Sequence, residues 1–286
     1  MAKKEMRKDF GNILDESWNE YKKNFKLIFK AYTFLYIIPS LIFLLIVIMF
    51  FTNMGDGLTP DFFKGKNLVV TYNNLPINLG NLNIDSSLYP IIGIGAVVLL
   101  VMIVLSYILY LSLFYLAFNQ KKDMTVGNIV SGGLKYFWPF LGLFILIVLA
   151  LIPLFILLII PGIIFVIYWI FAPFILVGEN QRITESMRKS FHLVRYRWWR
   201  TFGYFLLFFI IGILASLIIS LPASALAMIF KSAVSKGVVD MSLLTWTLIA
   251  SFILGIISKI IVTPLGIFFY KNFYLEMKKN PIKIRR

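Results

Sequence analysis

Long apolar runs alternate along the chain with shorter segments that carry the charged residues. The runs at 31–51, 91–118, 202–221 and 242–270 are each long enough to cross about 30 Å of hydrocarbon as a helix. The run at 137–177 contains no charge and is about twice the length that one crossing needs. Pro161 and Gly162 favour a turn inside it, which gives spans at 137–159 and 163–177. The pattern therefore predicts an all-α, polytopic membrane bundle of six transmembrane helices.

Three of these spans follow a stretch whose apolar residues recur at helical spacing, which is typical of an amphipathic helix in the headgroup region. We expect three cytoplasmic interfacial helices, and we hypothesise one membrane domain, 1–286, built from three repeats of such a helix and a hairpin, at 10–118, 126–178 and 183–270. Gly11-Asn12-Ile13 and Gly127-Asn128-Ile129 share letters. The alternative is that these are ordinary loop helices packed on the bundle. The apolar stripes are Phe10, Ile13, Leu14, Trp18, Tyr21 and Phe25, then Val126, Ile129, Val130, Leu134 and Phe137, then Ile183, Met187, Phe191, Val194 and Trp198.

Composition agrees with this architecture, since 60% of the 286 residues are apolar, 14% are charged and the formal net charge is +15. The basic residues are unevenly placed: 23 of the 28 Lys and Arg lie on the side of the membrane that would hold both termini. The positive-inside rule then predicts a multi-pass protein of the cell membrane with cytoplasmic N- and C-termini. Orientation accounts for the excess charge without nucleic acid as a partner. The absence of cysteine excludes disulfide scaffolds and cysteine-ligated metal sites.

One cation, Lys259, interrupts the last apolar run. Ser251, Gly255 and Thr263 recur with it every four residues, so the four share one helix face, which we expect to point into the bundle. No acidic residue lies within any span to pair with this lysine. Two interpretations stay open: a contact with an anion or a lipid phosphate, and a structural lysine that snorkels or caps free carbonyls.

A second candidate site is the basic segment around the third amphipathic stretch, where arginine and lysine would contact headgroups of membrane lipids, including anionic phospholipids. The candidate headgroup contacts are Arg182, Arg188, Lys189, Arg195, Arg197 and Arg200. The single histidine, His192, lies on the charged face of the same stretch and is expected to be a surface residue. No motif for a nucleophile, a nucleotide or a metal occurs, so we expect no catalytic residue, no metal and no cofactor, and a protein that is not an enzyme.

The segment 52–90 is the longest polar stretch and is placed outside the cell by the predicted topology. Residues 68–72 favour a short strand before a turn at Asn73-Asn74.

The region 125–210 resembles the YciC-like family of polytopic membrane proteins, which is similar to the membrane domain of some glycerophosphoryl diester phosphodiesterases. The residues that carry the resemblance are Pro161-Gly162, Ala172-Pro173, Ser186, Arg188, Ser190, Leu193 and the run Arg197–Arg200, with Pro264, Tyr270, Tyr274 and Lys278 near the end. The resemblance implies a helical membrane protein and an association with lipids or lipid-derived phosphates. It carries no esterase activity, because those relatives hold their catalytic residues in a separate soluble domain.

Three functions are compatible with the sequence. The leading hypothesis is a non-enzymatic membrane protein that binds or handles lipids or amphiphiles. The alternatives are a small-solute permease with an interior lined by Lys259, and a structural or regulatory subunit with a membrane-protein partner. A subunit would expose a span face rich in small residues such as Gly212 and Ser216.

Overall fold

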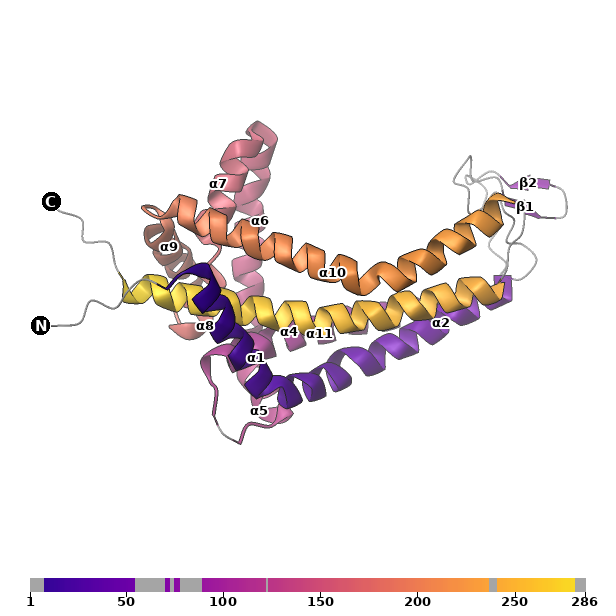
Figure 1. Ribbon diagram of the computed structural model, residues 1–286, viewed down its shortest axis with the longest axis horizontal. Coiled ribbons are helices and arrows are strands. Elements are labelled where there is room, and N and C mark those ends of the chain that lie inside the picture. Colours follow the sequence, from indigo (N-terminus) through magenta and orange to yellow (C-terminus); the bar gives the residue numbers. More distant parts are fainter. Residues whose placement is uncertain are drawn as a thin grey trace, which may run out of the picture. The chain divides into compact units, whose positions relative to one another are not determined.

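The computed structural model describes residues 8–54, 70–72, 75–77, 89–121, 123–236 and 241–280, and these are almost entirely helical (Figure 1). A π-helical segment, Thr33–Ile37, joins the first two helices, and two short strands lie in the segment that follows them. The helices are α1 (Phe10–Tyr32), α2 (Ile38–Met54), α4 (Tyr89–Phe118), α5 (Val126–Leu134), α6 (Phe137–Leu157), α7 (Ile159–Trp169), α8 (Ala172–Gly178), α9 (Ile183–Val194), α10 (Trp198–Ser235) and α11 (Met241–Lys279).

Six helical stretches among the described residues are long and apolar enough to cross a membrane, which confirms the predicted all-α architecture. They are Phe10–Phe50, Tyr89–Phe118, Phe137–Ile156, Ile159–Gly178, Trp198–Ser235 and Ser242–Lys279. The first of them has 41 residues. At 1.5 Å per residue it exceeds the hydrocarbon thickness about twofold, so its charged first part, α1, must lie largely outside the hydrocarbon.

Tertiary contacts divide the chain into two compact units. The first unit comprises Met1–Tyr32, Tyr107–Ile213 and Ile260–Arg286, and the second comprises Thr33–Ser106 and Leu214–Lys259. The long helices α4, α10 and α11 contribute to both units, whereas α5 to α9 belong entirely to the first.

The break within the long apolar run lies earlier than the sequence predicted. Leu158 is extended, with φ −158° and ψ 131°, and separates α6 from α7. Pro161 lies in the first turn of α7, where its missing N–H has no helical acceptor to lose. Gly162 allows close packing in the α6–α7 hairpin, since a Cβ there would lie 2.6 Å from the Phe155 ring. The turn at Pro161-Gly162 was therefore wrong in position, while the hairpin itself is present (Figure 1).

The core of the first unit surrounds the C-terminal part of α11. Phe268, Phe269 and Phe273 are each at most 1% exposed. The Phe269 ring lies 5.1 Å from that of Phe10 on α1 and 4.6 Å from that of Phe208 on α10. Elsewhere the spans expose many large apolar side chains, as expected of surfaces that face lipid.

The second unit contains the only strands described, β1 (Val70–Tyr72) and β2 (Leu75–Ile77), which pair antiparallel with Val70 opposite Ile77. The predicted strand is thus confirmed at 70–72, whereas 68, 69 and the Asn73-Asn74 turn lie outside the described residues. In the helical part of this unit, the hydroxyl oxygens of Ser216 on α10 and Ser258 on α11 lie 3.0 Å apart.

The two copies of Gly-Asn-Ile have the same local structure. Asp9 accepts a hydrogen bond from the Asn12 backbone N–H at the start of α1, and Thr125 accepts one from that of Asn128 at the start of α5. The following isoleucine is fully buried in both helices. The shared letters therefore mark equivalent helix starts. The threefold repeat of an interfacial helix and a hairpin stays a prediction.

Candidate functional site

Helix α9 packs on the break within the fourth span, where α7 ends at Trp169 and α8 begins at Ala172. Its inward face is formed by Ser186, Ser190 and Val194, which recur every four residues and are completely buried. The Ser190 hydroxyl donates to the carbonyl of Tyr168, 2.7 Å away, and accepts from the N–H of Phe171 at 3.2 Å. These are backbone groups at the junction of α7 and α8, and a buried polar group of this kind needs a partner. Ser190 therefore holds α9 against the fourth span at a fixed position.

A carboxylate at the end of α8 holds the other side of α9. The Glu179 side chain accepts from Lys189 at 2.8 Å and from Tyr274 at 2.6 Å, and it pairs with Lys278 at 2.8 Å. Asn180 follows with a φ of 49°, a left-handed residue that turns the chain from α8 toward α9. Burial alone would raise the pKa of Glu179, but the hydrogen bonds from Lys189, Lys278 and Tyr274 outweigh it and lower the pKa to about 2.

This carboxylate predicts an acid-sensitive stability. Because the folded pKa lies below the ordinary value of 4.5, Glu179 stabilises the fold above pH 4.5, and this contribution is lost as the pH falls toward 2. We expect Glu179→Gln to be less stable than wild type by on the order of 2 kcal/mol at pH 7, with the difference shrinking below pH 4.5. Thermal midpoints in detergent from pH 7 to pH 3 check this. A difference that stays constant across this range would contradict the prediction.

Between α7 and α9 lies an open groove of about 410 Å³. Both helices belong to the first unit. Most of the lining is apolar, and the single charged side chain in it is Arg188. The lining residues are Phe165, Trp169, Thr184, Met187, Arg188 and Phe191. A volume in this range is typical of small-molecule sites. The groove therefore combines an open, mostly apolar surface beside a membrane span with one cation supplied by an amphipathic helix.

Of the six cations proposed as headgroup contacts, three are exposed and the other three are held by contacts with other elements of the fold. Arg182, Arg188 and Arg195 are exposed. Lys189 is bound to Glu179. Arg197 and Arg200 make internal contacts, which are described next.

Arg197 is 7% exposed, and its guanidinium donates to the carbonyls of Met277 and Asn280 at the end of α11. The last carbonyls of a helix lack partners within the helix and carry its negative dipole end, so a buried arginine suits them. Arg200 pairs with Glu276 at 3.1 Å and donates to the carbonyl of Lys8 at 2.8 Å. The prediction of a headgroup contact is thus corrected for the buried Arg197, which fastens α10 to α11. Arg200, whose side chain is 20% exposed, links α10 to α11 and to the segment before α1, and its headgroup contact stays a prediction.

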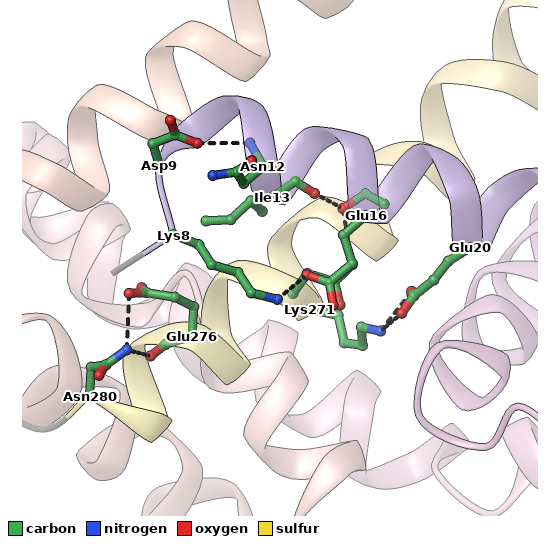
Figure 2. Close-up of polar contacts among 11 residues, drawn as sticks. Lys8, Asp9, Asn12, Ile13, Glu16, Glu20, Lys271, Glu276 and Asn280 are labelled. Atoms are coloured by element: carbon green, nitrogen blue, oxygen red, sulfur yellow. Dashed lines mark hydrogen bonds and ion pairs between the residues drawn. The ribbon is translucent and has the colours of Figure 1, made fainter. Parts of the chain in front are cut away.

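A buried polar cluster also joins α1 to α11 (Figure 2). The Lys271 ammonium lies 2.7 Å from both carboxylate oxygens of Glu20, and Asn272 donates to the Ser17 hydroxyl at 3.1 Å. Lys271 is 4% exposed. A second ion pair on α1, between Lys8 and Glu16, lies at the surface, with side-chain exposures of 45% and 41%.

Lys259 and its stripe are placed differently from the sequence prediction. Ser251, Gly255 and Lys259 are exposed, so they do not point into a packed interior, and Thr263 is half-buried. The Lys259 ammonium lies 4.1 Å from the ring centroid of Tyr36, a cation–π contact within the second unit. The polar contact between α10 and α11 in this unit is made by Ser258, the neighbour of Lys259.

Two other predictions concern small residues and metals. Gly212 faces α11, since a Cβ on it would lie 3.6 Å from Val262, and Ser216 bonds to Ser258. These two residues therefore contribute to packing within the chain.

His192 is exposed on α9, and the described residues contain no group of three or more histidine, cysteine or acidic side chains that could hold a metal.

Sequence reasoning missed the acids that organise the first unit: Glu20, Glu179 and Glu276. A partial signal exists for Glu179, because two of its partners, Tyr274 and Lys278, were already singled out by the family resemblance. For Glu20 the sequence gives no such signal, since its partner Lys271 lies 251 positions away.

Comparison with known proteins gives one family match. Residues 94–277, more than half of the chain, match the family described as Domain of unknown function (DUF7847). No curated protein and no solved structure matches the chain. The resemblance to the YciC-like family is not confirmed by this match and stays an expectation. The matched region includes α5 to α9 and all of α10, and therefore both sides of the groove. The six candidate spans indicate a polytopic membrane protein, and the chain belongs to the DUF7847 family.

Proposed function

We propose that this protein is a non-enzymatic membrane protein that binds a phospholipid, with one acyl chain in the α7–α9 groove and the phosphate at Arg188. The observation that carries the proposal is the open groove itself, whose lining is mostly apolar and contains a single cation. An amphiphile has the same division between an apolar chain and a charged head.

The apolar part of the groove suits a flexible chain. Phe165 and Trp169 come from α7, with ring centroids 5.2 Å apart, and Met187 and Phe191 come from α9. Methionine adapts its shape to irregular partners. Because α7 is part of a candidate membrane span, an acyl chain would reach the groove from the hydrocarbon without crossing water. The volume lies at the lower end of the usual range for ligand sites, which favours one chain rather than a whole diacyl lipid.

The charged part of the groove suits a phosphate. The Arg188 side chain is 68% exposed, so its guanidinium is accessible to a ligand. Guanidinium and phosphate form two parallel hydrogen bonds, which fixes the orientation of a headgroup as well as binding it. Arg182 and Arg195 are exposed near the two ends of the same helix and add positive potential toward anionic lipid. The cytoplasmic orientation predicted from the basic residues would place this helix at the inner leaflet.

The proposal predicts lipid retention that depends on Arg188. Wild type and variants are purified from nanodiscs of equal phosphatidylglycerol and phosphatidylcholine, and retained lipid is measured by native mass spectrometry. We expect Arg188→Gln to lower the retention of phosphatidylglycerol by roughly five- to tenfold, the loss of one charge-assisted contact. Met187→Trp, which fills the groove, is expected to lower the retention of both lipids.

Arg195→Gln is the matched control, because Arg195 is exposed at the end of the same helix but does not line the groove. Equal losses in Arg188→Gln and Arg195→Gln would indicate general surface attraction and contradict the groove. Wild type that retains no lipid would overturn the proposed function as a whole.

A further inference from the structure

We infer that Glu185 sets the headgroup selectivity of the α7–α9 groove, by competing with an anionic headgroup for Arg188. The inference rests on the proposed function, since it concerns the same site. Glu185 lies outside the groove lining and acts by binding Arg188, the one cation in that lining.

The geometry of the pair supports competition. The Arg188 Nη2 atom lies 3.0 Å from Glu185 Oε1 and 2.8 Å from Oε2, so one guanidinium nitrogen is engaged by both carboxylate oxygens. A phosphate held by two parallel hydrogen bonds uses two guanidinium nitrogens, and Nη2 takes part in such a pair on either side of the guanidinium, with Nε or with Nη1. An anionic headgroup that binds there must displace the carboxylate or share the guanidinium with it.

The pair is also weak enough to be exchanged. The side chains of Arg188 and Glu185 are 68% and 31% exposed, and they are three residues apart on one helix. Pairs of this kind contribute little to stability, because water screens them and both side chains lose rotamer freedom. The contacts described for the Glu185 carboxylate are both to Arg188, whereas Glu179 is held by three side chains. Glu185 is therefore the acid of this region that a ligand can most readily replace.

The consequence is a preference among headgroups. A headgroup with a phosphate and no cation meets the repulsion of the displaced carboxylate. A headgroup that also carries an ammonium provides that carboxylate with a new partner, so its phosphate can occupy Arg188 while its amine pairs with Glu185. The Arg188–Glu185 pair thus favours zwitterionic over purely anionic phospholipids, relative to a groove that contains Arg188 alone.

The test compares phosphatidylglycerol with phosphatidylethanolamine. We expect Glu185→Gln to raise the retention of phosphatidylglycerol by about two- to fivefold, which corresponds to the free energy of one exposed ion pair. The retention of phosphatidylethanolamine is not expected to rise. In an Arg188→Gln background the same change is expected to have no effect on either lipid. The thermal midpoint of each variant shows that it is folded.

The outcomes separate the inference from the proposed function. If wild type retains lipid and Arg188→Gln loses it, but Glu185→Gln leaves the ratio of the two lipids unchanged, the selectivity role of Glu185 is wrong and the groove stands. An equal rise in the retention of both lipids would also overturn the inference, because it would indicate easier access to the groove and not discrimination between headgroups. Loss of all binding in wild type would instead reject the groove.

Discussion

Glu20→Gln is expected to destabilise the first unit by about 3 kcal/mol, because it leaves the ammonium of Lys271 buried without its counter-charge. Figure 2 shows the Glu20 carboxylate facing this ammonium. Both carboxylate oxygens lie 2.7 Å from it, and the Lys271 side chain is 5% exposed. A charge in such a place has little access to water and gains its stability from the pair.

Glu16→Gln provides the control on the same helix. Glu16 pairs with Lys8 at the same distance of 2.7 Å, but both side chains are more than 40% exposed, so its loss is expected to cost less than about 1 kcal/mol. The two variants are compared by thermal midpoint and by denaturant titration in the same detergent. Equal effects of the two substitutions would contradict the view that burial gives the Glu20–Lys271 pair its importance.

Gly133→Ala is the second substitution with a large expected effect. A Cβ at this position would lie 2.8 Å from the backbone nitrogen of Ser112 and 2.9 Å from the carbonyl carbon of Leu111. The obstacle is the backbone of α4, which cannot rotate away as a side chain can. We expect a loss of about 2–3 kcal/mol from overpacking, even though alanine is the better helix former.

Gly127→Ala in the same helix separates packing from helix propensity. Its Cβ would lie 3.8 Å from the Thr125 hydroxyl, an ordinary contact, so this change is expected to be neutral or to stabilise by up to about 1 kcal/mol. Thermal midpoints of the two variants check the opposite signs. A Gly133→Ala variant as stable as Gly127→Ala would show that α4 and α5 do not approach as closely as described.

The spans could be predicted because lipid imposes a simple requirement on length and polarity. Residues 91–118 were predicted as one helix, and α4 runs from Tyr89 to Phe118. The position of the α6–α7 break was not predictable by the same reasoning. Proline and glycine at 161 and 162 suggested a turn, but proline is also well tolerated in the first turn of a helix. In the structure Pro161 lies inside α7, and Gly162 packs against Phe155 of α6.

The groove and the ion pairs were beyond the sequence because they depend on contacts between distant segments. Arg188 and Arg197 look alike in the sequence as members of one basic segment. The structure separates them, since α9 ends at Val194 and Arg197 then faces the end of α11, whereas Arg188 stays at the surface. The pairing of Glu179 with Tyr274 likewise requires the position of α11 beside α8. Periodicity predicts a helix face, but not which helix will cover it.

The link between Glu20 and Lys271 has a consequence for biogenesis. Ser17 and Glu20 belong to α1, and their partners Asn272 and Lys271 belong to α11, which the ribosome makes some 250 residues later. Chains are made from the N-terminus, and a contact across some 250 residues forms only after α11 has been synthesised. Until then the polar face of α1 has to remain in water or be shielded by a chaperone. A nascent chain arrested before residue 271 should therefore expose α1 to protease, while a chain extended past α11 should protect it.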